Sequence, residues 1–111
     1  MSGAAHPSYP VIWRRNGGPV YSGRLDVEED RIRLSGTRPG QSRALRMEIP
    51  ISVLTSASVS RDRAARLRGL PTLTLELRDS AAVQVAVVAG AGRLQELAAI
   101  LGAHILAPEA A

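Results

Sequence analysis

The chain has 111 residues, enough for one hydrophobic core but not for two. It contains no cysteine, which excludes disulfide bonds and thiolate zinc sites, and its three aromatic residues leave the core to be built from aliphatic side chains. The net charge is +4 and all 14 basic residues are arginine, so attraction to an anionic partner is permitted but not required.

The N-terminal segment 1–8 has no charged start followed by an apolar run, so we expect a disordered tail and no secretory signal. No apolar stretch approaches the roughly 18 residues that suggest a membrane span, and the expected location is the cytoplasm. A single domain is expected over 9–107, followed by a short tail over 108–111.

Seven stretches have the pattern of β-strands, because apolar or β-branched residues alternate with polar ones between turn signals. They are 9–15, 20–27, 31–36, 44–51, 52–61, 70–79 and 81–88. The alternation is most regular in 70–79, where Leu73, Leu75 and Leu77 are expected to point inward. In 52–61 the alternation places Leu54 on the same side as the serines, which is the expected outward face.

The periodicity changes after Gly92 from that of strands to that of a helix. One apolar stripe runs along 93–106 and predicts an amphipathic helix, formed by Leu94, Leu97, Ala98, Leu101 and Ile105. Hairpins followed by one helix predict a mainly β fold: a seven-stranded antiparallel barrel of two packed sheets, capped at an open end by the C-terminal α-helix.

Residue types that carry catalysis or bind metals do not converge in this sequence. His6 falls in the expected tail, and His104 lies near a helix C-terminus, where a partly charged imidazole suits the helix dipole. The acidic run 28–30 falls in a hairpin turn, and the glycines of 90–92 lack the spacing of a phosphate-binding loop. We therefore expect no enzymatic activity, no metal and no cofactor.

Arginine side chains are the remaining candidates for a binding site. Four arginines lie in the loop 61–69, RDRAARLRG, and three more lie around the first turn. The candidates are Arg61, Arg63, Arg66, Arg68, Arg14, Arg15 and Arg24. The loop has two interpretations: a partner-docking patch, because the planar guanidinium pairs well with carboxylates, or a solvated connection whose charge Asp62 partly neutralises.

The order of these elements resembles the pleckstrin-homology-like domains, in particular their bacterial and GRAM-type members. The resemblance is carried by GPVYSGRLDVEEDRIRLSG as an early hairpin, IPISVLTSASVSR as the middle strand, and LTLELRDSAAVQVAV with RLQELAAIL as the final hairpin and helix. It covers about 20–106, but the helix lacks the tryptophan usual in eukaryotic members. The resemblance implies that 61–69 crosses between the two sheets, away from the family's lipid site at the first hairpins.

The resemblance implies a non-enzymatic binding or scaffold module. We expect it to engage a protein partner or to form a homo-oligomer. The alternative is attachment to an anionic membrane surface through arginine-rich loops, although the family's basic run is not matched and its nearest equivalents are Arg14, Arg15 and Arg24. Nucleic acid is disfavoured as a partner, because the few aromatic residues do not alternate with basic ones as in a base-stacking platform.

Overall fold

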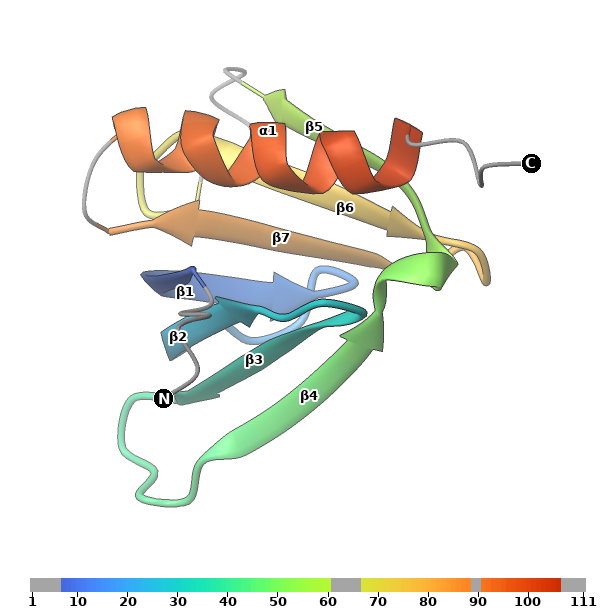
Figure 1. The fold of residues 1–111 in the computed structure, drawn as a ribbon. Helices are drawn as coiled ribbons and strands as arrows, with labels where there is room; N and C mark the ends of the chain where they lie inside the picture. Colours follow the sequence, from blue (N-terminus) through green and yellow to red (C-terminus); the bar gives the residue numbers. More distant parts are fainter. Residues whose placement is uncertain (1–6, 61–66, 89–90, 107–111) are drawn as a thin grey trace, which may run out of the picture.

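A computed structural model describes residues 7–60, 67–88 and 91–106, and these form seven strands and a C-terminal helix (Figure 1). The strands are β1 (Ser8–Arg15), β2 (Tyr21–Val27), β3 (Arg31–Thr37), β4 (Leu45–Pro50), β5 (Leu54–Ser60), β6 (Thr72–Leu77) and β7 (Ala82–Val87). A short 3-10 helix, η1 (Ile51–Val53), joins β4 to β5, and the α-helix is α1 (Ala91–Leu106). The predicted strands and helix are confirmed, with their ends displaced by at most two residues.

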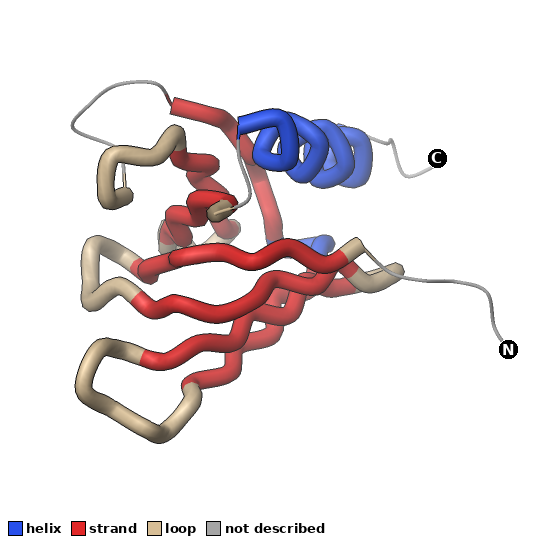
Figure 2. Tube along the Cα trace, turned by 90° about the vertical axis from the view of Figure 1, so that its left-hand side faces the viewer, coloured by secondary structure: helices blue, strands red, loops and turns tan. Residues whose placement is uncertain are grey.

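All seven described strands belong to one antiparallel sheet, in the order β4-β3-β2-β1-β7-β6-β5. The predicted seven-stranded antiparallel fold is confirmed as a half-barrel, and its two layers are the two halves of this one sheet, which curls around a common core (Figure 2). The expected crossing at 61–69 is wrong, because β5 and β6 are antiparallel neighbours in one layer. The chain passes between the layers at η1 instead, and α1 lies across β5, β6 and β7.

The core is mainly aliphatic, and both layers and α1 contribute to it, but the two largest buried side chains are the aromatic rings of Trp13 and Tyr9. Leu73 and Leu75 are fully buried, which confirms the inward face expected for that strand. Leu54 is the exception to the predicted alternation: it is buried in the core, with 6% of its surface exposed. The pairing of β5 with β6 shifts between Leu54 and Ser56, and such a bulge changes the face to which the next side chain points.

Two glycines bring β2 and β3 unusually close together near the end of their hairpin. Gly23 lies opposite Gly36, and a Cβ added to Gly23 would lie only 2.0 Å from the carbonyl oxygen of Ser35. In the space left by the missing side chains, Trp13 Nε1 donates a hydrogen bond of 3.1 Å to that oxygen. The Trp13 ring also stacks on Tyr21, with 4.8 Å between ring centroids. These contacts fix the base of the β1–β2 loop.

Candidate binding surface

Acidic and basic side chains are separated along the layer formed by β1 to β4. Residues 8–25 and 34–47 contain no aspartate or glutamate, and the acids of this layer are confined to 26–30 and to Glu48. The β1–β2 and β3–β4 loops lie at one end of the hairpins, and the acidic β2–β3 turn lies at the other. At the first end, the charged residues of this layer are all arginines. We call the set of Arg14, Arg15, Arg38 and Arg43 the basic end.

At the acidic end, the arginines are engaged by carboxylates within the chain. The pairs are Arg24–Asp26, Arg31–Asp30, Arg31–Glu48, Arg33–Glu28 and Arg33–Glu48, with nitrogen–oxygen distances between 3.0 and 3.4 Å. The hydrogen bond from Arg31 holds the pKa of the Asp30 carboxyl below its usual value. Arg24, a predicted binding residue, is thus separated from the basic end and already paired with Asp26.

The β1–β2 loop presents Arg15 on a short, well-fixed turn. Asn16 and Gly17 both have positive φ, 51° and 74°, and Gly18 N donates to Arg15 O at 2.9 Å, as in a type I′ turn. Asn16 is also tied to β7, since its N donates to Ala82 O at 2.8 Å and its Oδ1 accepts from Ala82 N at 2.9 Å. The first part of the five-residue connection 16–20 is therefore a fixed turn, and it holds the backbone of Arg15 in a defined place.

The β3–β4 loop adds two arginines that sequence reasoning did not select, Arg38 and Arg43. Gly40 has a φ of 81° and Gln41 N donates to Arg38 O at 3.0 Å, so a tight turn begins at Arg38. Neither arginine forms an ion pair with any residue that the structure describes, and the same is true of Arg15. The available signal was the long acid-free stretch around them.

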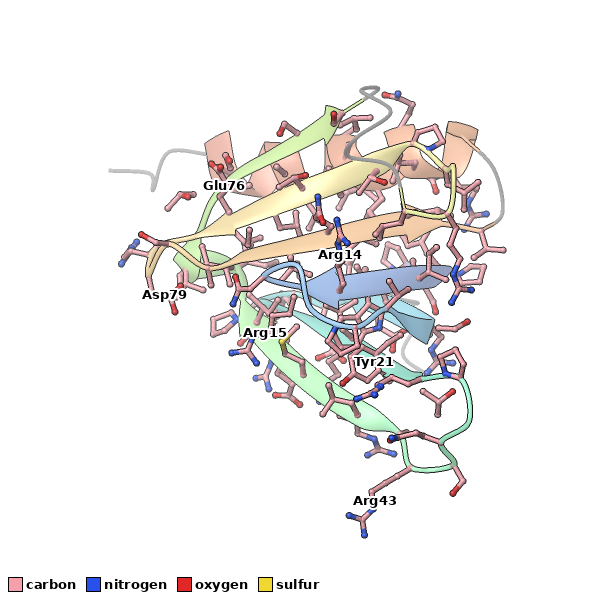
Figure 3. All side chains as sticks on the ribbon, turned by 180° about the vertical axis from the view of Figure 1, so that it is seen from behind. Arg14, Arg15, Tyr21, Arg43, Glu76 and Asp79 are labelled. Carbon is pink, nitrogen blue, oxygen red and sulfur yellow. The ribbon has the colours of Figure 1, made fainter. Side chains whose placement is uncertain are left out.

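One face of the molecule shows this arrangement directly. Figure 3 shows Arg14, Arg15, Tyr21 and Arg43 on the side turned to the viewer. Arg14 lies on the outer face of β1, half-buried, and its Nε donates a hydrogen bond to Gln84 Oε1 on β7. Arg15 is exposed, and Tyr21 is half-buried by its stacking on Trp13. This side of the molecule therefore presents several arginines together with a partly exposed aromatic ring.

The predicted arginine loop is only partly within the described residues: Arg61, Arg63 and Arg66 lie outside them, and Arg68 lies within. Arg68 is exposed in a turn, with a φ of 50°. The turn is anchored on the outer face of the sheet by an apolar cluster. The members of the cluster are Ile12, Leu67, Ala86, Val20 and Leu70. Because Val20 belongs to the β1–β2 loop, the described end of 61–69 lies beside the first hairpin, contrary to the expectation from the resemblance.

Other kinds of site find less support in the described residues. Trp13 and Tyr9 are 0% and 1% exposed, so neither ring is available to stack on a nucleic-acid base. Within 7–60, 67–88 and 91–106, no cluster of His, Cys, Asp or Glu side chains is arranged to hold a metal ion. None of the helices in those ranges has the length and apolar character needed to cross a membrane.

The curled seven-stranded sheet with its C-terminal helix gives this protein a pleckstrin-homology-like fold. A similar solved structure is the pleckstrin homology (PH) domain of USP37, with a TM-score of 0.55 and 14% sequence identity over 92% of this chain and 97% of that chain. At this identity the likeness shows the fold alone. No family model and no curated protein matches the chain, and membership of the bacterial or GRAM-type group stays a prediction.

Proposed function

We propose that this domain is a non-enzymatic binding module whose basic end docks an acidic segment of a protein partner. The fold is one that commonly serves protein or lipid binding. The observation that carries the proposal is the set of exposed arginines on two neighbouring loops, Arg15, Arg38 and Arg43, none of which pairs with a described carboxylate. A partner's carboxylates would supply the counter-charges that this end of the β1–β4 layer lacks.

The form of the surface favours a protein over a lipid headgroup. The β1–β2 connection, 16–20, contains no basic residue and begins with a turn held to β7, so it does not form the basic loop that grips several phosphates in lipid-binding members of this fold. Arginine and tyrosine are enriched at protein interfaces, and this side of the molecule presents the exposed Arg15 and the partly exposed Tyr21.

An anionic membrane surface is the second candidate. The observation that favours it is the acid-free character of the same end, because each arginine near an anionic bilayer contributes about 1 kcal/mol of salt-sensitive attraction without any shaped pocket. The two candidates use the same side chains and differ in whether the anions sit on a peptide or on lipids.

The test compares two double variants that remove equal charge from opposite ends of the layer. Arg38→Gln with Arg43→Gln neutralises part of the basic end, and Arg24→Gln with Arg33→Gln is the matched control. Amide chemical shifts are followed while a polyglutamate peptide is titrated, and sedimentation is measured with phosphatidylcholine vesicles that contain phosphatidylserine.

We expect the peptide to shift amides at the basic end, and the first double variant to weaken its affinity about three- to tenfold with little effect from the control. Sedimentation with vesicles in the absence of peptide binding would select the membrane candidate. Equal losses in the two double variants, or no binding of either probe, would refute a role for the basic end.

A further inference from the structure

The strand β4 forms one edge of the sheet, and no described strand pairs with its outer side. Figure 1 shows it at the margin of the sheet farthest from α1. An edge strand presents unpaired N–H and C=O groups, which form a template for another strand. Leu45 at its start is one of the exposed large hydrophobic residues, with 42% of its surface accessible. The edge is therefore suited to pairing with a further strand.

The hydrogen bonds of β4 determine which backbone groups face this open edge. Ile51 N donates to Asp30 O at 2.9 Å, which flanks the facing residues Arg31 and Pro50 and makes them a non-hydrogen-bonded pair. Pairs alternate along an antiparallel ladder, so Leu45, Met47 and Ile49 are the β4 residues that bond to β3. The N–H and C=O groups of Arg46 and Glu48 consequently point outward.

The sequence of β4 is complementary to itself about Met47. In Leu45-Arg46-Met47-Glu48-Ile49, apolar residues occupy alternate positions, and the two residues between them have opposite charges. In an antiparallel pair of such strands centred on Met47, Arg46 faces Glu48 of the second copy, and Glu48 faces its Arg46. The residues with outward backbone groups are therefore also the residues with complementary charges.

We propose that β4 pairs with β4 of a second copy of this chain, around a two-fold axis at Met47, so that the two sheets become continuous. Each facing Arg46–Glu48 pair exchanges both of its backbone hydrogen bonds and forms an ion pair on the outer face. Arg46 is exposed and has no ion pair with a described residue, so it is available for this contact. On the other face, Leu45 is covered by Ile49 of the second copy.

Charge also selects this register over its neighbours. A register centred on Arg46 places Arg46 opposite Arg46 of the second copy. A register centred on Glu48 places Glu48 opposite Glu48 of the second copy. Both registers therefore bring like charges together. A shift by one residue turns each apolar side chain to the wrong face. The other edge strand, β5, has no charged residue between 54 and 60 and encodes no such preference. An edge pairing of this kind is smaller than a standard interface and forms a weak, concentration-dependent dimer.

This interface is a second surface, distinct from the basic end. It uses Arg46 and Glu48 and does not require Arg15, Arg38 or Arg43. The double variant Arg38→Gln with Arg43→Gln keeps both facing charge pairs and loses only longer-range attraction between the two ends, so it should weaken self-association by no more than about twofold. The failure of one proposal leaves the other intact.

The experiment measures self-association by sedimentation velocity over a wide range of concentrations. Arg46→Glu places like charges at both facing positions, and so does Glu48→Arg, so each alone should weaken association at least about tenfold. An equimolar mixture of the two variants restores opposite charges at both positions and should associate about as well as the unmodified chain. Arg24→Glu makes the same charge change elsewhere on the outer face and should have no effect.

A measurement on the unmodified chain does not depend on the folding of any variant. Amide hydrogen exchange at Arg46 and Glu48 should slow as the protein concentration rises, whereas the amide of Met47, already bonded to β3, should change little. A chain that stays monomeric, an association that survives Arg46→Glu, or a mixture no more associated than its components would overturn the proposal.

Discussion

Replacement of Gly23 by alanine would place a methyl group where β2 and β3 leave no room. The added Cβ would lie 2.0 Å from the carbonyl oxygen of Ser35 and 2.5 Å from the Cα of Gly36. Both are backbone atoms, which cannot move aside by a rotamer change. Because non-bonded carbon contacts are favourable at about 3.5 Å or more, the two strands would have to separate by roughly 1 Å or more.

Overpacking of this kind costs about 1–3 kcal/mol, and loss of the Trp13–Ser35 hydrogen bond adds about 1 kcal/mol. We therefore expect Gly23→Ala to lower the free energy of unfolding by about 3 kcal/mol, a large part of the 5–15 kcal/mol typical of a domain. Gly40→Ala is the matched control: no atom lies within 4 Å of its added Cβ, and only its φ of 81° is unfavourable, at a cost of about 1–2 kcal/mol.

Both variants are measured by urea denaturation, followed by the fluorescence of Trp13, the single tryptophan, and by far-UV circular dichroism. Gly36→Ala should fall between them, because its added Cβ would lie 2.9 Å from Ser22 O. If Gly23→Ala were no more destabilising than Gly40→Ala, β2 and β3 would not approach as closely as described, and the account of how Trp13 is positioned would be wrong.

Two further substitutions test the anchoring of the 67–70 turn and of α1. Thr72 is fully buried, and its Oγ1 accepts a hydrogen bond from Leu67 N and donates one to Leu70 O, each at 2.9 Å. Because Thr72→Val removes both bonds, it should lower the free energy of unfolding by about 2 kcal/mol, as measured by denaturant titration. Burial, followed by the hydrogen bond that Tyr9 donates to Glu96, raises the pKa of Tyr9 above 10.0. The folded state thus retains the Tyr9 proton more strongly than the unfolded state, and this stabilisation is complete below about pH 10 and is lost as pH rises through the raised pKa. Tyr9→Phe should not show this loss of stability at alkaline pH. An identical pH dependence of the free energy of unfolding in the two proteins would contradict the assigned role of the Tyr9 hydroxyl.

The strands and the helix could be predicted because their apolar periodicity is local to each segment. The inward positions of Leu73 and Leu75 follow from alternation alone, and burial confirms them. Leu54 was misplaced because its orientation depends on a shift in pairing with β6, a partner that lies beyond the arginine loop. Alternation within one strand contains no information about such a shift. The same limitation applies to Leu67, which is buried only because the turn folds back onto Ile12 and Ala86.

The candidate surface was predictable in part. Arg14 and Arg15 were predicted as binding residues because they lie next to a turn. The loop 61–69 was predicted because it contains four arginines within nine residues. Arg38 and Arg43 are further apart and were missed, although no acid lies near them in the sequence. Their significance depends on the hairpin register, which brings two loops to the same end of the layer and sends the acids to the other. The local density of arginines was therefore a poorer predictor of the candidate surface than the absence of acidic residues.

The charge layout and the proposed pairing of β4 reinforce each other. Antiparallel pairing places the start of β4, next to Arg43, beside the end of β4 in the second copy, where Pro50 lies close to the acidic β2–β3 turn. The basic end of each copy then lies beside the acidic end of the other, which is an attractive arrangement at separations within a Debye length. Added salt should therefore weaken self-association. The same geometry directs the two basic ends away from each other, so a dimer still offers both of them to acidic partners.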